Sequence, residues 1–115
     1  MNTATIASHF DRNDPVVKDI YDRLLAALRV FGEVHESPKQ TSIHLDNANG
    51  FAGVYTRKST ISLRFRLSRK IDHPRITKVE QISSHRFMHT VKLASVDDVD
   101  QQLLEWMEEA YALAG

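Results

Sequence analysis

The side chains best suited to chemistry in this sequence are cations and histidines in its middle part. Arginine offers planar, paired donors to phosphate or carboxylate groups, and lysine offers a mobile point charge. Most of these residues fall at turns and at the ends of expected strands, where side chains can form a binding rim. We therefore predict a site for an anionic ligand, either a phosphorylated small molecule or a nucleic-acid backbone. The nine residues of this predicted site are Lys39, Ser42, His44, Arg57, Lys58, Arg75, Lys78, Arg86 and His89.

Opposite charges are separated along the chain, although its formal net charge is zero. Residues 57–92 contain ten lysines or arginines and two acids, whereas residues 97–109 contain six acids and no base. One interpretation is that the two segments neutralise each other on the surface. The other is that the basic segment faces an anionic partner. The sequence leaves both open, because the position of the acidic segment in space decides between them.

A small enzyme is the alternative function, with Lys39, His44 and His89 sharing one pocket as acid and base groups. This alternative requires the three side chains to converge in space. His85 and His89 would lie roughly 13 Å apart on an extended strand, at about 3.3 Å per residue, so we predict no metal site. The chain contains no cysteine, and no nucleophile motif surrounds its serines. We therefore predict no catalytic residue and no cofactor.

A structural or oligomerisation module is the third hypothesis. A homodimer would form by pairing of exposed strand edges, or by contact of the acidic segment with a neighbour's basic face. No apolar run approaches the roughly 20 residues that span a bilayer, and the N-terminus lacks the pattern of a signal peptide. We therefore expect no membrane partner and a cytoplasmic location.

Two amphipathic helices are predicted, one towards each end of the chain. Pro15 follows an Asn-Asp pair that can cap a helix, and apolar residues then recur at three- and four-residue spacing until Gly32 stops the helix. Ser95 and Asp98 resemble a capping box ahead of the second helix, whose apolar stripe covers residues 99–113. The apolar stripes of both helices are typical of core positions.

The segment between the helices predicts strands, most clearly at 61–67. Four apolar residues there alternate with Ser62, Arg64 and Arg66, so one face of this strand is dry and the other is basic. We place no aromatic residue on the face of the two arginines, so a base-stacking platform is not expected there. Gly53 indicates a bulge or a close backbone approach. Further strands are predicted at 33–36, 43–45, 51–55 and 87–93, while residues 76–82 fit either a strand or an irregular segment.

This order of elements predicts a two-layer α+β fold. An antiparallel sheet of about five strands would be flanked by the N-terminal and the C-terminal helix, which cover one of its faces. Residues 1–12 show no periodicity and are predicted to form a flexible arm. Residues 13–115 would form a single domain of ordinary size.

The chain resembles an uncharacterised family, domain of unknown function 5655. The likeness lies in residues 39–45 (KQTSIHL), 51–54 (FAGV), 74–76 (PRI), 78–83 (KVEQIS) and 86–89 (RFMH), and it continues into the last helix at Trp106 and residues 110–111 (AY). One departure is Phe87, where tryptophan is frequent in the family. The resemblance implies a small soluble bacterial domain, found alone or attached to larger proteins. It implies no catalytic residue, because the family has no agreed ones.

Overall fold

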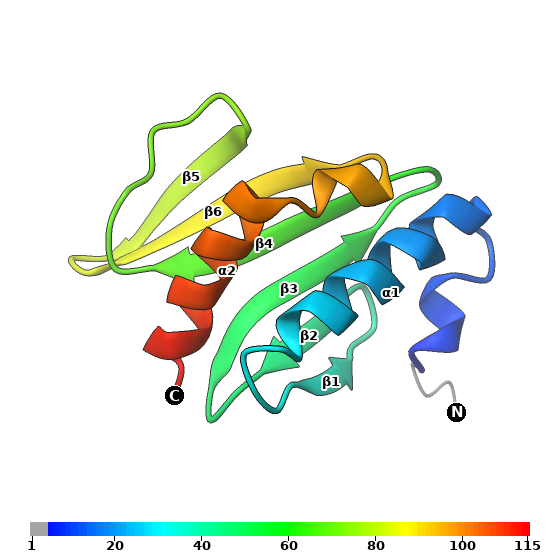
Figure 1. Cartoon of the computed structure of the whole chain (residues 1–115), viewed down its shortest axis with the longest axis horizontal. Coiled ribbons are helices and arrows are strands. Elements are labelled where there is room, and N and C mark those ends of the chain that lie inside the picture. Colours follow the sequence, from blue (N-terminus) through cyan, green and yellow to red (C-terminus); the bar gives the residue numbers. More distant parts are fainter. Residues whose placement is uncertain (1–4) are drawn as a thin grey trace.

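Two helices lie on one face of a six-stranded antiparallel sheet in the computed structural model, which describes residues 5–115 (Figure 1). The helices are α1 (Pro15–Leu28) and α2 (Gln101–Leu113). The predicted two-layer α+β fold is therefore confirmed, with six strands in place of about five. Residues 5–12 of the predicted arm include a turn of 3-10 helix, η1 (Ala7–His9), and Phe10 packs against Tyr21 of α1 with ring centroids 5.2 Å apart. The first four residues of that arm lie outside the described part of the chain.

The sixth strand comes from the segment whose sequence fitted either a strand or an irregular crossing. That segment pairs along its length with the strand that follows it, across two register irregularities. The spatial order of the strands is β1-β2-β3-β4-β6-β5, so the last two strands are exchanged relative to the chain order. The strands are β1 (His35–Pro38), β2 (Ile43–Asp46), β3 (Gly50–Thr56), β4 (Ile61–Leu67), β5 (Ile76–Ser83) and β6 (Arg86–Leu93).

Strand β4 lies in the middle of the sheet and divides the molecule into a dry side and a wet side. Successive side chains of a strand point to opposite faces, and the four apolar residues of β4 are all buried beneath the helices. Arg64 and Arg66 therefore stand on the other face, as predicted. No helix within residues 5–115 packs on that face, which we call the open face of the sheet (Figure 1).

Helix α2 begins after a short turn of 3-10 helix, η2 (Val96–Asp98). The predicted capping box of Ser95 and Asp98 is present, but it closes this turn and not the α-helix. The cap of α2 is Asp100, whose carboxylate accepts a hydrogen bond from the Leu103 N–H at 3.0 Å. The apolar stripe of α2 then meets that of α1 and the dry side of the sheet in one core.

Gly32 ends the turn that follows α1 and holds a backbone φ of +150°, which side chains rarely adopt. A Cβ atom there would also lie 2.5 Å from the Tyr111 hydroxyl, which donates a hydrogen bond to the Glu33 carbonyl. Gly32→Ala should therefore lower the free energy of unfolding by about 1–3 kcal/mol, as measured by urea denaturation. The same substitution in a Tyr111→Phe background separates the two causes, because only the backbone strain then remains. An unchanged midpoint in both backgrounds would contradict the prediction.

Candidate functional site

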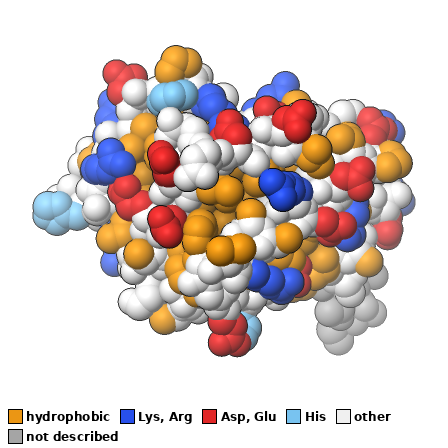
Figure 2. Space-filling view, in the orientation of Figure 1, with side chains coloured by type: hydrophobic (Ala, Val, Ile, Leu, Met, Phe, Trp, Pro, Cys, Tyr) orange, Lys and Arg blue, Asp and Glu red, His pale blue; other side chains and the backbone are white. Residues whose placement is uncertain are grey.

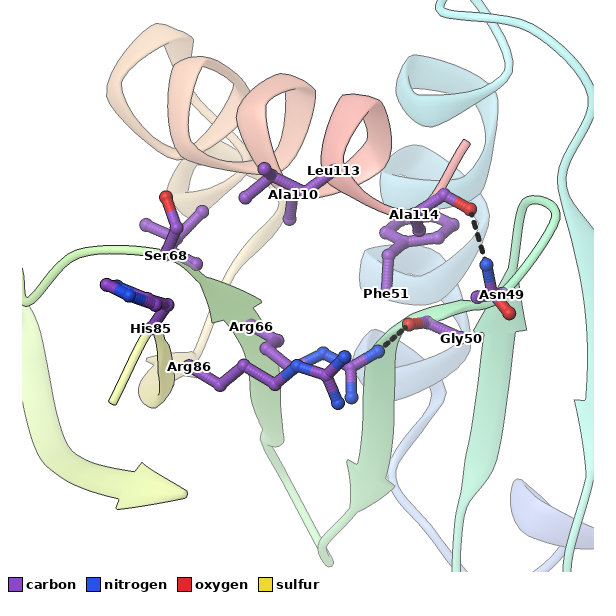
Figure 3. A pocket seen from close by; sticks show the side chains of 11 residues that line it. Asn49, Gly50, Phe51, Arg66, Ser68, His85, Arg86, Ala110, Leu113 and Ala114 are labelled. Carbon is purple, nitrogen blue, oxygen red and sulfur yellow. Dashed lines mark hydrogen bonds between the residues drawn. The ribbon is translucent and has the colours of Figure 1, made fainter. Parts of the chain in front are cut away.

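A cleft of about 470 Å³ opens at one end of the sheet, beside the C-terminal end of α2 (Figure 3). Its polar side is formed by the end of β4 and the turn between β5 and β6, which contribute Arg66, Ser68, His85 and Arg86. Its other side is apolar and includes Leu113 of α2. The cleft therefore joins three parts of the chain that are far apart in sequence.

Arg66 and Arg86 are neighbours because β6, and not β5, pairs with β4. Arg66 lies opposite Met88 in this pairing, so Arg86 is its diagonal neighbour on the same face, at a typical separation of about 7–8 Å. Arg66 donates from Nη2 to the Gly50 carbonyl at 2.7 Å. Within residues 5–115, neither guanidinium has a carboxylate at ion-pair distance. The result is two adjacent positive charges (Figure 3) that have no negative partner among the residues the structure describes.

The apolar side of the cleft includes Phe51, Ala110 and Leu113. Phe51 is almost fully buried and packs edge-on against Tyr111 of α2, with ring centroids 5.3 Å apart. Leu113 is 53% exposed, which is unusual for a large apolar side chain in this structure. A ligand with an anionic group and an apolar portion would complement both sides of the cleft.

The acidic last helix neutralises part of the basic segment. Arg75, a member of the predicted site, donates to the Asp100 carboxylate at 2.7 Å and to the Asp98 carbonyl at 2.7 Å. Arg69 makes a two-point ion pair with Glu109, at 2.8 and 3.1 Å. Burial raises the pKa of Asp100, but the Leu103 N–H and the Arg75 guanidinium outweigh it and hold that pKa below its usual value. The interpretation that the two segments neutralise each other is therefore correct only for part of the basic segment, because Arg66 and Arg86 have no carboxylate partner within residues 5–115. The other interpretation, an anionic partner, stays a prediction.

The other predicted cations do not join this cleft. Lys78 pairs with Glu80 at 3.1 Å, and Lys58 lies 3.9 Å from an Asp14 carboxylate oxygen. Arg57 is exposed in the turn between β3 and β4, at the opposite end of β4 from the cleft. That distance is on the order of 20 Å at about 3.3 Å per residue. The predicted rim is thus distributed over the molecule and cannot surround one small ligand.

Lys39, His44 and His89 do not share a pocket. His44 is exposed on the open face, whereas His89 is fully buried on the helix side of the sheet, and Lys39 lies in the turn after β1. The Lys39 N–H donates to the carbonyl of Ser42, whose side chain is buried in the same turn. The structure therefore does not assemble the acid and base groups that the enzyme alternative requires.

His89 is a buried, hydrogen-bonded core residue. Its Nε2 atom accepts a hydrogen bond from the Ile71 N–H at 2.9 Å, which places the ring proton on Nδ1. Nδ1 has no hydrogen-bond partner within residues 5–115. Burial lowers the pKa of His89 below its usual value. Because Nε2 accepts the hydrogen bond from the Ile71 N–H, the ring is neutral in this arrangement, and the same bond connects the loop 68–75 to the sheet.

The described residues 5–115 contain no group of three or more histidine, aspartate or glutamate side chains that could hold a metal ion. None of the helices in that part of the chain is long and apolar enough to cross a membrane. On the helix-bearing face, acidic and basic side chains are mixed around a central apolar band, so residues 5–115 form no extended patch of one charge there (Figure 2).

Arg66, Ser68 and Leu113 line the cleft but were not among the predicted site residues. The alternation in residues 61–67 identified Arg66 as a cation on the wet side, which is the signal that could have selected it. The missing information was the strand order, which brings Arg86 next to it.

The comparisons with known proteins identify a family but no activity. The sequence model of the family described as "Domain of unknown function (DUF5655)" matches residues 6–114, nearly the whole chain. Neither the curated proteins nor the solved structures contain a match. Any proposal about the function of this chain therefore depends on the geometry of the site.

Proposed function

Since the chain belongs to the family described as "Domain of unknown function (DUF5655)", whose description names no activity, we propose from the geometry that it binds an organic anion. The observation that carries this proposal is the pair of unneutralised guanidinium groups, Arg66 and Arg86, in the cleft at the end of the sheet. Two like charges that are diagonal neighbours repel each other. An anion bound between them removes that repulsion and gains charge-assisted hydrogen bonds.

The size and lining of the cleft support a small ligand with an apolar portion. A volume of about 470 Å³ falls within the range of roughly 300–1,000 Å³ that is usual for small-molecule sites. A phosphate, carboxylate or sulfonate would lie at Arg66 and Arg86, and the apolar portion would contact Leu113 and Phe51. Guanidinium groups suit this role because their planar donors match the oxygen atoms of such anions.

Binding is better supported than catalysis. Ser68 and His85 both line the cleft, but no hydrogen bond joins them, so the contact between a nucleophile and its base is missing. The cleft lining includes no carboxylate side chain that could act as a general base.

Arg86→Ala should weaken the binding of anilinonaphthalene sulfonate, a fluorescent probe that combines a sulfonate with an apolar ring system. Loss of a hydrogen bond to a charged group typically costs about 1.5–3 kcal/mol, so the dissociation constant should rise roughly tenfold or more. Arg86→Lys should retain part of the affinity, because it keeps the charge but not the planar donors. The measurement is a fluorescence titration at constant ionic strength.

The matched control is Arg23→Ala, which removes one guanidinium from the exposed side of α1, away from the cleft. The affinity of Arg23→Ala for the probe should equal that of the unmodified protein. The Arg86 side chain makes no hydrogen bond or ion pair within residues 5–115, so Arg86→Ala should leave the unfolding midpoint unchanged. Equal titration curves for Arg86→Ala and Arg23→Ala would refute the cleft as the anion site.

A further inference from the structure

The open face of the sheet carries an excess of positive charge that continues from the cleft. The strand pairings place five cations on this face, against two acids, Glu80 and Asp46. Glu80 pairs with two of the five, Arg64 at 3.4 Å and Lys78 at 3.1 Å. The three cations that keep an uncompensated charge within residues 5–115 are Arg66, Arg86 and Lys92.

An aromatic ring also stands on this face, contrary to the expectation from the sequence. Tyr55 of β3 lies opposite Ser62, and its ring leans over Gly53, where a Cβ atom would lie only 3.3 Å from the ring. Because Gly53 has no side chain, the Tyr55 ring can occupy the space above it. The close contact at Gly53 is thus with a side-chain ring and not, as the sequence had led us to expect, with the backbone. The register shift of β2 and β3 also lies elsewhere, next to Leu45.

Cations flank this ring. The Arg64 guanidinium lies 5.5 Å from the ring centroid of Tyr55, and that of Arg57 lies 6.0 Å from it. Arg64 also reaches the Tyr55 hydroxyl at 3.5 Å. Aromatic rings and guanidinium planes are the two kinds of surface on which unpaired nucleobases stack. Tyr55 and Arg64 together provide both kinds.

The ring borders a hollow of about 350 Å³ on the open face. Arg66, Gly50 and Phe51 line both this hollow and the cleft. Arg66 therefore belongs both to the proposed anion site and to the hollow that the aromatic ring borders. A ligand with an anionic group at Arg66 and Arg86 would extend a planar group towards Tyr55.

We propose that the open face binds single-stranded nucleic acid. Its phosphates contact Arg66, Arg86 and Lys92, and one of its bases stacks on Tyr55 and Arg64. The inference rests on the proposed function, because a phosphate is then the anion held by Arg66 and Arg86. A single strand fits this face better than a duplex, since only unpaired bases expose their planes for stacking.

The test is fluorescence anisotropy of a labelled oligothymidylate of about 12 nucleotides, within the usual range of site sizes, across a salt series. Three phosphate contacts predict a slope of about −2 for log K against log salt, at about −0.7 per contact on a single strand. Tyr55→Ala should weaken binding roughly tenfold, because stacking on an aromatic ring is lost. Tyr55→Phe keeps the ring and should bind like the unmodified protein.

Two further comparisons make the result specific. Arg86→Ala should reduce the salt slope by about 0.7, whereas the control Arg23→Ala should leave it unchanged. A duplex of the same length should bind more weakly than the single strand, because its bases are stacked internally. Equal affinity for both, with no effect of Tyr55→Ala, would overturn the stacking role and leave a general polyanion surface.

The two proposals can fail separately. Absence of oligonucleotide binding at low salt would overturn this inference, while the sulfonate probe still tests the cleft. If Arg86→Ala changes the binding of neither probe, the cleft proposal fails as well. Tenfold weakening by Tyr55→Ala, rescue by Tyr55→Phe and a slope near −2 would together establish the open face as a single-strand site.

Discussion

Acidification below about pH 6.5 should destabilise this protein through His89, the buried histidine that accepts a hydrogen bond from the Ile71 N–H. Burial lowers the pKa of His89 in the folded protein, whereas the unfolded chain has the ordinary value. Between these two values the unfolded chain binds more protons than the folded one. The free energy of unfolding therefore falls as the pH falls through this range, by at most about 1.4 kcal/mol per pH unit.

His89→Gln isolates this contribution. The amide oxygen of the introduced glutamine can still accept a hydrogen bond from the Ile71 N–H, but glutamine does not titrate in this range. Urea denaturation of both proteins between pH 7.5 and 4.5 should show a steeper loss of stability for the unmodified protein. The other five histidines are present in both proteins, so their effects cancel in the difference. Parallel stability curves would show that the pKa of His89 is equal in the folded and unfolded states.

Trp106→Ala should produce the largest loss of stability among single substitutions in α2. Trp106 is almost fully buried, lies stacked near Phe65 with centroids 6.0 Å apart, and meets the edge of His73 at 5.1 Å. Removing so large a buried ring typically costs about 3–5 kcal/mol, against a total stability of about 5–15 kcal/mol for an ordinary domain. The loss should also loosen α2 over the sheet, because the ring joins that helix to β4 and to the loop 68–75.

The measurement for Trp106→Ala is urea denaturation followed by circular dichroism, since the chain has no other tryptophan to report by fluorescence. Leu113→Ala is the control in the same helix and should change stability by no more than about 0.5 kcal/mol, because its side chain is half exposed. Trp106→Phe should lose less than Trp106→Ala, since it keeps one aromatic ring in the core. Similar losses of stability for Leu113→Ala and Trp106→Ala would contradict this account of the core.

The sequence was sufficient for the layers of the fold because periodicity is a local property. The alternation around Arg64 and Arg66 separated the two faces of β4, and the helical stripes of α1 and α2 identified the buried sides. Strand β5 was ambiguous because much of it is exposed at the edge of the sheet, so no buried face imposes a clear alternation on it.

The candidate site depended on information that no local pattern contains. Arg86 becomes a neighbour of Arg66 only because β6 pairs with β4, and Tyr55 joins the open face through the pairing of β3 with β4. The separated charges in the sequence likewise did not indicate which residues pair. Arg75 is not free to bind a ligand, because α2 starts beside it and the Asp100 carboxylate accepts its hydrogen bond. Pairing between distant segments is a property of the whole fold, and the sequence of one chain does not reveal it.

The hydrogen bond from Arg66 to the Gly50 carbonyl also makes the two cleft arginines differ in side-chain freedom. A free arginine side chain loses up to about 2 kcal/mol of rotational entropy when a ligand immobilises it. Arg66 has already lost much of this freedom on folding, so an anion that binds to it meets a preorganised donor. Arg86 has no such anchor among residues 5–115 and can adapt its position to the ligand. In the proposed anion site, Arg66 would thus define where the anion binds, and Arg86 would adapt to anions of different size.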